Sequence, residues 1–196
     1  VIKYIFEQVG EKCAEELKLW QATIPEISDK IPRVTLKEAQ EIILKRTGVD
    51  HTKELDLAPE DEREICKWVR EEYKSELVFV TKYSTSKRPF YTMPDPDDPD
   101  LTLSFDLLGR GVEWLTGGQR ITDVKQLEKA AQDRGVDLEK SELYLQAFRY
   151  GMPPEGGWSF GSERITQGIL GLANIREASL FPRDMERVDI RLSSTK

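Results

Sequence analysis

The segment Gly111–Arg120 (GVEWLTGGQR) holds side chains that could bind a small anionic ligand together with a hard cation. Glu113 lies three residues before the Thr116 hydroxyl, and oxygen donors of these two kinds are ligands that Mg²⁺ accepts in proteins. Arg120 offers a planar guanidinium that can pair with a carboxylate through two hydrogen bonds. The two glycines after Thr116 would let a ligand approach the backbone closely. The alternative interpretation is an ordinary Gly-Gly turn between a strand and a helix.

A second candidate is the segment Arg88–Met93 (RPFYTM), in which a guanidinium and a phenol follow each other closely. Arg88 and Tyr91 are an odd number of residues apart, so a regular strand would place them on opposite faces. A bulge or a strong twist would be needed to bring both side chains to one ligand. The alternative is a core strand with Phe90 and Met93 inside.

The third candidate, Gly156–Ile165 (GGWSFGSERI), has the composition of a junction between a strand and a helix. Glu163 and Arg164 would open the helix, where the positive end of the helix dipole favours an anionic ligand. The spacing is neither that of a P-loop nor that of a dinucleotide-binding fingerprint. Taken together, Glu113, Arg120 and Arg164 suit a site for a triphosphate, Mg²⁺ and a small carboxylate.

The composition limits the classes of protein to which the chain can belong. Its 196 residues carry 29 basic and 36 acidic side chains and a formal charge of −7, a poor electrostatic match for nucleic acid as a general partner. No run of about 18 apolar residues occurs, so no segment is expected to span a bilayer. The first residues mix Lys and Glu into apolar positions, which argues against a secretory leader. We therefore expect a cytoplasmic protein with no membrane partner.

The small number of histidines and cysteines argues against several kinds of catalytic and metal site. His51 is the single histidine, which argues against a catalytic triad built on histidine and against a histidine-rich metal site. Metal chemistry must therefore use carboxylates, which favours Mg²⁺ over Zn²⁺. Cys13 and Cys66 both fall on apolar faces of expected helices, so we expect them to be buried free thiols in a reducing cytosol.

Hydrophobic periodicity and helix signals predict that the first 75 residues are helical. Apolar residues recur at intervals of three and four over residues 2–17. Thr35 followed by Glu38 fits a capping box for a second helix, which Gly48 ends. Pro59 suits the first position of a third helix.

After residue 75 the sequence favours short strands and then further helices. The expected strands cover residues 76–81, 88–93, 102–108, 111–115 and 158–160, and the expected helices cover 123–134, 138–150 and 163–172. This order of elements predicts an α+β fold in one domain.

Six motifs together resemble one family. They are RPFYTMPDP from Arg88, the SFD…RG stretch Ser104–Gly111, the E..TGGQRI stretch Glu113–Ile121, FRYGMPP at Phe148–Pro154, GSER at Gly161–Arg164, and GLANIREASLFPRD at Gly171–Asp184. In order and spacing the chain resembles, from about Val1 to Val188, the C-terminal half of the catalytic domain of aspartyl-tRNA synthetases of the archaeal and eukaryotic-like type.

The resemblance implies part of a class II synthetase catalytic domain, an antiparallel sheet flanked by helices. Residues 1–196 would be its C-terminal part, with a helical segment at 1–75 and the sheet, the site and the family's motif 3 at 76–190. An anticodon-binding β-barrel, motif 1 and motif 2 are not found in these 196 residues. Because motif 2 holds the α-phosphate of ATP, we expect this chain alone to be inactive.

The resemblance also assigns roles to residues. Glu113 matches a ligand of Mg²⁺ and ATP, and Thr116 matches a position, usually Ser in the family, that touches metal and aspartate. Arg120 matches the arginine that pairs with the side-chain carboxylate of the substrate. Arg88 stands where the family commonly has Lys or Arg near the substrate, and Tyr91 matches a tyrosine of the amino-acid pocket.

In motif 3 the resemblance implies that Gly161, Ser162, Glu163 and Arg164 bind ATP, with Arg164 on the γ-phosphate. The expected catalytic residues are thus Arg164, Arg120 and Glu113. Two departures stand out, because Ser159 replaces a common glycine and Ser162 replaces a usual Leu or Ala.

The function implied is ATP-dependent activation of aspartate to aspartyl-adenylate and transfer to tRNA(Asp), or also to tRNA(Asn). ATP and Mg²⁺ are the implied cofactors, and the full-length enzyme is expected to be a homodimer. Two alternatives remain open. One is a non-catalytic synthetase paralogue that acts as a binding or regulatory module, and the other is an asparagine-forming ligase that uses the same adenylate.

Overall fold

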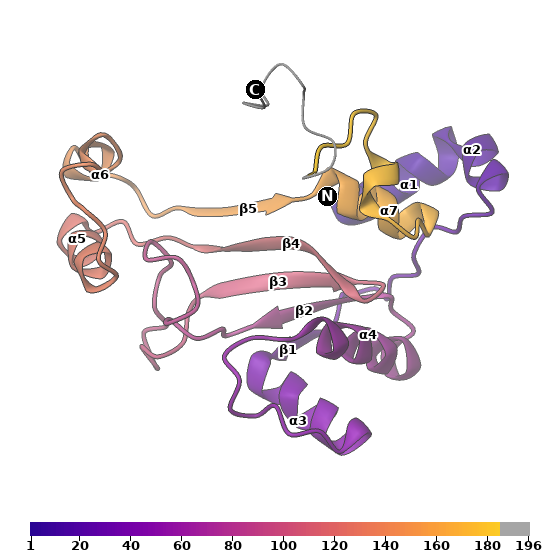
Figure 1. Ribbon diagram of the computed structural model, residues 1–196, viewed down its shortest axis with the longest axis horizontal. Coiled ribbons are helices and arrows are strands. Elements are labelled where there is room, and N and C mark those ends of the chain that lie inside the picture. The colour runs from indigo at the N-terminus through magenta and orange to yellow at the C-terminus, as the bar shows by residue number, and fades with distance from the viewer. Residues whose placement is uncertain (185–196) are drawn as a thin grey trace, which may run out of the picture. The chain divides into compact units, whose positions relative to one another are not determined.

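The computed structural model describes residues 1–184 (Figure 1), and contacts along the chain divide it into two units. The larger unit is Glu26–Ser159. The smaller unit joins Val1–Pro25 to the chain from Phe160 onward. The expected motif 3 region, 76–190, extends beyond the described residues.

Two helices of the larger unit begin and end where local signals predict. In α3 (Leu36–Thr47), the Thr35 hydroxyl accepts the Glu38 backbone N–H at 3.1 Å, and the Glu38 carboxylate accepts the Thr35 N–H at 2.7 Å. That second bond lowers the pKa of Glu38. The helix ends at Gly48 with φ of 76°, a left-handed conformation that suits glycine. Pro59 begins α4 (Pro59–Tyr73), so both predictions are confirmed.

The described part of the chain forms a five-stranded sheet in the order β1-β2-β3-β4-β5. The strands are β1 (Arg33–Thr35), β2 (Leu77–Thr81), β3 (Ser104–Gly109), β4 (Val112–Gln119) and β5 (Gly156–Phe160). β1 runs parallel to β2, whereas β3 is antiparallel to both β2 and β4. The sheet is therefore mixed rather than purely antiparallel, and the segment expected to be helical contains a strand.

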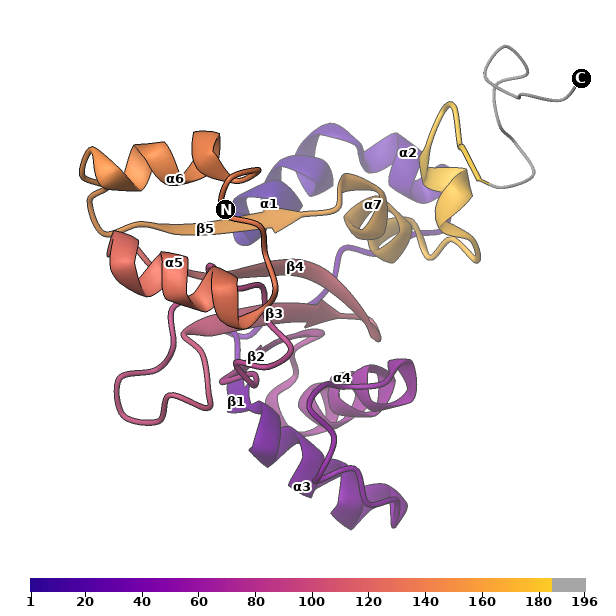
Figure 2. The same ribbon diagram turned by 60° about the vertical axis from the view of Figure 1, so that its left-hand side comes forward.

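α3 and α4 cover one face of this sheet, as both ribbon views show (Figures 1 and 2). Their apolar side chains share one buried cluster with side chains of the first three strands, made of Val34, Leu36, Ala39, Ile43, Ile65, Cys66, Val69, Val78, Val80, Tyr83 and Leu108. Burial of this apolar area is the main favourable term that holds the helices on the sheet.

A bulge interrupts the pairing of β3 with β4. Leu107 lies opposite Leu115, but the next residue, Leu108, lies opposite Glu113. Trp114 is thus an extra residue on β4. This explains why Trp114 and Leu115 are both buried although they are neighbours on one strand.

The expected strand over residues 88–93 is wrong. This segment forms a turn, in which the Thr92 N–H donates to the Pro89 carbonyl at 3.0 Å, followed by an isolated bridge between Thr92 and Arg120. Pro89 has no N–H to donate to a ladder, which disfavours regular pairing. β4 also continues to Gln119, beyond the expected end at residue 115 and through the expected Gly-Gly turn.

Two further helices lie together beyond one end of the strands, α5 (Val124–Asp133) and α6 (Glu142–Arg149) (Figure 1). They share a second apolar cluster, built on Ile121, Leu127, Leu145 and Phe148, into which Phe90, Tyr91 and Met93 pack. The irregular segment at 88–93 is therefore anchored by its apolar side chains.

The smaller unit contains α1 (Ile2–Lys12), α2 (Ala14–Leu19), α7 (Ser162–Leu170) and a 3₁₀ turn η1 (Ile175–Ala178). The single helix expected over residues 2–17 is in fact two, because the backbone at Cys13 (φ −120°, ψ 31°) leaves the helical region.

The two cysteines differ in exposure, so the expectation of two buried thiols is correct for Cys66 and wrong for Cys13, which is half-buried. Burial raises the pKa of Cys66 to about 12. At pH 8 we expect iodoacetamide to modify Cys13 and to leave Cys66 unmodified in the folded chain, because only about one thiol in ten thousand would be ionised there. Peptide mass mapping checks this. In urea both should react, and equal rates in the folded chain would contradict the structure.

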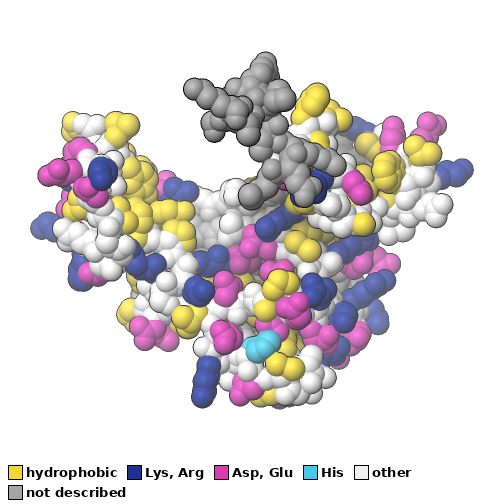
Figure 3. All heavy atoms as spheres, viewed as in Figure 1, with side chains coloured by type: hydrophobic (Ala, Val, Ile, Leu, Met, Phe, Trp, Pro, Cys, Tyr) yellow, Lys and Arg dark blue, Asp and Glu magenta, His cyan; other side chains and the backbone are white. Residues whose placement is uncertain are grey.

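The surface in Figure 3 intersperses acidic and basic side chains, in line with the absence of a basic cluster in the sequence. His51 lies on this face and pairs with Asp61, whose Oδ1 is 2.9 Å from His51 Nδ1. Asp61 also accepts the Ala58 N–H at the start of α4, so His51 supports a helix end. Among residues 1–184, no helix has the length and apolar character needed to cross a membrane.

Candidate active site

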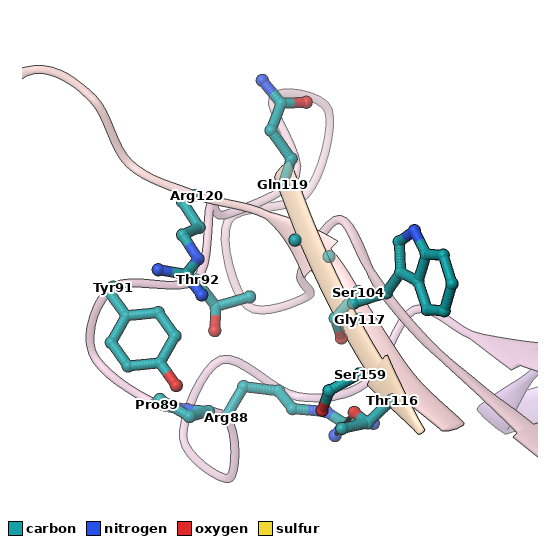
Figure 4. A pocket seen from close by; sticks show the side chains of 13 residues that line it. Arg88, Pro89, Tyr91, Thr92, Ser104, Thr116, Gly117, Gln119, Arg120 and Ser159 are labelled. Atoms are coloured by element: carbon teal, nitrogen blue, oxygen red, sulfur yellow. Dashed lines mark hydrogen bonds between the residues drawn. The ribbon is translucent and has the colours of Figure 1, made fainter. Parts of the chain in front are cut away.

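A cavity of about 310 Å³ opens at the end of β4 in the larger unit (Figure 4). All four residues of the expected amino-acid pocket line it, namely Arg88, Tyr91, Thr116 and Arg120. The other lining residues are Pro89, Thr92, Ser104, Gly117, Gly118, Gln119, Gly157, Trp158 and Ser159.

The irregular backbone at 88–93 brings Arg88 and Tyr91 to the same cavity. The turn at Pro89 removes the strict alternation that a strand would impose. Two backbone bonds then fasten the segment to the end of β4, from Ile121 N–H to the Tyr91 carbonyl and from Met93 N–H to the Gln119 carbonyl, each 2.9 Å. The objection raised by the odd spacing therefore does not apply.

Arg88 is held by the buried carboxylate of Asp106, a partner that the sequence alone does not indicate. Its Nη2 lies 2.6 Å from Asp106 Oδ2, and its Nη1 donates to the Thr116 hydroxyl at 3.3 Å. The guanidinium also stacks 3.8 Å from the centre of the Tyr83 ring. Burial, and then the neighbouring Asp106 charge, raise the pKa of Tyr83. Asp106 lies opposite Thr116 in the β3–β4 register, a pairing that no local sequence signal reveals.

Arg120 lies in a more open environment than Arg88. Its guanidinium is 5.1 Å from the centre of the Tyr91 ring and its Nη1 is 3.9 Å from Glu155 Oε1. Burial raises the pKa of Tyr144 on α6, and the charge of Arg120 and a hydrogen bond with Arg120 oppose that rise. Figure 4 shows the Arg120 side chain between Tyr91 and β4.

Gly117 is required by close packing of strands. A Cβ at this position would lie 2.6 Å from the Cβ of Trp158 on β5 and 2.7 Å from the Phe105 ring on β3. The sequence predicts that this glycine admits a ligand to the backbone. The structure shows that neighbouring protein atoms, rather than empty space, occupy the position of its missing side chain.

Oxygen donors for a cation are present, but they are not concentrated. Among the described residues no three histidine, cysteine or acidic side chains cluster as a metal site. Asp106 Oδ1 is buried without a hydrogen-bond partner, and the Thr116 hydroxyl lies on the adjacent strand. Glu113 is half-buried on β4 and is not among the residues that line the cavity. This donor set fits Mg²⁺ only if phosphate oxygens or waters complete its shell, as is usual for that ion.

The expected ATP-binding residues belong to the smaller unit. Gly161 is the N-cap of α7, and Ser162, Glu163 and Arg164 form its exposed first turn. The Glu163 carboxylate contacts its own backbone N–H and the Ser162 hydroxyl, which together lower its pKa. A carboxylate is favoured at this positive end of a helix, as an anionic ligand would be.

Comparison with known proteins bears out the resemblance inferred from the motifs. Residues 1–185 match the family described as tRNA synthetases class II (D, K and N). The chain is 42% identical over 184 residues to the aspartate–tRNA(Asp/Asn) ligase of Thermus thermophilus, covering 94% of this chain and 43% of that protein. It is 43% identical over 166 residues to the aspartate–tRNA(Asp) ligase of Thermoplasma volcanium, covering 85% and 37%. It thus spans less than half the length of either relative.

Solved structures agree with the fold. The aspartyl tRNA synthetase from Entamoeba histolytica superposes with a TM-score of 0.87 at 35% identity, covering 95% of this chain and 39% of that one. The asparaginyl-tRNA synthetase from Pyrococcus horikoshii complexed with asparaginyl-adenylate gives 0.84 at 31% identity, covering 94% and 42%. The expected class II catalytic fold is confirmed, and the chain belongs to the class II tRNA synthetases of the D, K and N group.

Proposed function

We propose that residues 1–196 are the C-terminal part of the catalytic domain of an aspartate–tRNA ligase, which activates aspartate with ATP and transfers it to tRNA. Residues 1–75 form its first segment, in which α3 and α4 pack on the sheet, and residues 76–190 contain the amino-acid site and motif 3. The anticodon-binding domain, motif 1 and motif 2 would belong to the remaining length that the relatives possess.

The observation that carries the proposal is the position of Arg120 at a cavity with Arg88, Tyr91 and Thr116. Within the described part of the chain Arg120 has no tight ion pair, since Glu155 is 3.9 Å away. Its guanidinium can therefore receive the side-chain carboxylate of aspartate through two hydrogen bonds, which an uncharged asparagine amide cannot match. The names of the relatives favour the same amino acid.

The chemistry needs alignment and charge neutralisation more than proton transfer. The α-carboxylate of aspartate is already ionised, so it attacks the α-phosphorus of ATP without a general base, and pyrophosphate leaves. Arg120 orients the substrate by its side chain, and Arg164 neutralises charge on the γ-phosphate. Glu113 and Thr116 would hold Mg²⁺, with Asp106 close to Thr116, and the ion would supply further positive charge to the phosphates.

Further partners follow from the same proposal. The full-length enzyme would be a cytoplasmic homodimer that charges tRNA(Asp). Charging of tRNA(Asn) as well would depend on the anticodon domain. One of the relatives is named for both tRNAs and another for tRNA(Asp) alone.

Pyrophosphate exchange tests the proposal directly. We expect aspartate-dependent exchange between ATP and pyrophosphate with the natural gene product, whose intact mass should be near ~50 kDa by domain arithmetic. The 196-residue chain alone should give no exchange. A natural product of full length that shows no exchange with aspartate would refute the assignment.

A second candidate is a synthetase paralogue that binds ligands without catalysis. It is favoured by the departures in motif 3, because Ser159 lines the cavity where the family commonly has glycine, and Ser162 opens α7. This candidate predicts a natural product close to 196 residues that binds aspartate or ATP and does not exchange pyrophosphate. An asparagine-forming ligase, in contrast, would make asparagine from aspartate, ATP and ammonia.

A smaller effect on aspartate binding is expected from loss of the interaction between Tyr144 and Arg120. We expect Tyr144→Phe to raise the KM for aspartate about twofold to tenfold with little change in kcat, since a typical hydrogen bond contributes a net stabilisation of about 0.5–1.5 kcal/mol. Steady-state exchange kinetics measure both constants. Tyr150→Phe is the matched control, because Tyr150 is 82% exposed at the end of α6. An unchanged KM would show that this bond does not position Arg120.

A further inference from the structure

Two arginines line the cavity, and their carboxylate partners differ sharply. Arg88 and Asp106 are both largely buried, and they touch at 2.6 Å. Arg120 and Glu155 are 40% and 32% exposed, and their closest polar atoms are 3.9 Å apart. A direct charge-assisted hydrogen bond would measure about 2.7–2.9 Å. The first pair is a fixed part of the fold, whereas the second is a loose pair that solvent reaches.

The backbone keeps Glu155 beside Arg120 whatever its side chain does. The Arg120 N–H donates to the Glu155 carbonyl at 3.1 Å. Two residues later, a Cβ on Gly157 would lie 3.2 Å from Arg120 Nη2, so this short segment also shapes the space around the guanidinium. Among residues 1–184 the Glu155 side chain makes only the long contact with Arg120, so it can move aside while the segment stays in place.

We propose that Glu155 is a displaceable counter-ion of Arg120, which a bound carboxylate replaces. Resting on the proposed function, this makes Glu155 a specificity-determining residue that acts through Arg120. A planar carboxylate gains two direct hydrogen bonds when it displaces one long contact. An anion of other geometry gains less and still meets the negative charge of Glu155.

The residues that line the cavity explain why a counter-ion beside Arg120 would be useful. None of the described residues that line the cavity is acidic. Asp106 neutralises the charge of Arg88. Without Glu155, the charge of Arg120 would attract any anion that enters the cavity. A site that must also accept a triphosphate would then risk binding phosphate in the place of the amino-acid carboxylate. Glu155 lowers that risk at a modest loss of affinity for aspartate.

The test removes the negative charge of Glu155 and keeps the shape of its side chain. We would measure the affinity of the natural gene product for L-aspartate and for pyrophosphate by calorimetry, in wild type, Glu155→Gln and Glu155→Asp. We expect Glu155→Gln to bind aspartate about fivefold more tightly, since an exposed pair is worth up to about 1 kcal/mol. Pyrophosphate affinity should increase by a larger factor, and Glu155→Asp should stay close to wild type.

A matched control separates the local effect from the change in net charge. Glu128 on α5 is 29% exposed and pairs with Arg149 at 2.7 Å, away from the cavity-lining residues. Glu128→Gln should leave both affinities within twofold of wild type. The gain from Glu155→Gln should also vanish when Arg120→Gln is already present, because the effect acts through that guanidinium.

The outcomes of this experiment separate the counter-ion role of Glu155 from the proposed function. If aspartate binds wild type, and Glu155→Gln leaves the affinity unchanged or weaker, the counter-ion proposal is overturned. If aspartate does not bind wild type, the proposed function fails, and succinate then serves as the carboxylate probe. Tighter succinate binding by Glu155→Gln would sustain the counter-ion role on its own. Equal binding, or no binding by either protein, would overturn it.

Discussion

Replacing Arg120 with alanine is expected to lower the affinity for aspartate by about 30-fold or more. Arg120 is the guanidinium that a substrate carboxylate would meet in the cavity, and loss of one partner from such a charged pair costs about 2–5 kcal/mol. Arg120→Lys should recover only part of this loss, because an ammonium keeps the charge but loses the planar arrangement of donors. The dependence of pyrophosphate exchange on aspartate concentration measures the effect in the natural gene product.

The control for this prediction is Arg149→Ala. Arg149 on α6 pairs with Glu128 and Glu142 and is not among the cavity-lining residues, so its loss should leave the aspartate dependence within about twofold. An Arg120→Ala protein that keeps its aspartate affinity within tenfold of wild type would remove Arg120 from the amino-acid site.

The second large effect concerns stability. Arg88→Leu is expected to lower the free energy of unfolding by about 3–5 kcal/mol, because Asp106 would remain buried without its positive partner. The Tyr83 hydroxyl beside Asp106 is neutral, so it would not replace the lost positive charge. Urea unfolding followed by tryptophan fluorescence measures the change.

The double variant Arg88→Leu/Asp106→Leu decides between loss of charge compensation and simple loss of packing. If the isolated buried carboxylate is the cause, the double variant should recover most of the stability that Arg88→Leu loses. If both variants are equally unstable, the Arg88 side chain contributes mainly through its contact with the Tyr83 ring.

Features that depend on neighbouring residues could be predicted from the sequence. The capping box of Thr35 with Glu38 and the end of α3 at Gly48 both rest on bonds that span only a few residues, and the structure contains them. The strand β1 could not be predicted in this way. Its three residues form a strand because they pair with β2, more than forty positions along the chain.

The candidate site likewise contains residues that the sequence indicates and residues that it does not. Arg88, Tyr91, Thr116 and Arg120 were grouped through the family resemblance, and the structure places them at one cavity. Their roles in binding aspartate stay predictions. Asp106, Tyr144 and Glu155 were missed. Their importance lies in contacts across strands and between helices and loops, which neither composition nor spacing along the chain records.

The bulge at Trp114 separates the hairpin from the part of β4 that carries the site. Because Asp106 lies opposite Thr116 beyond the bulge, deletion of the extra residue would restore regular pairing near the hairpin and leave Thr116 on the face that it shares with Asp106. Deletion of one residue between Thr116 and Arg120 would instead turn Arg120 to the opposite face. Homologous chains that use this cavity should therefore vary freely in length at the hairpin around Arg110, but keep a fixed count of residues from the bulge to Arg120.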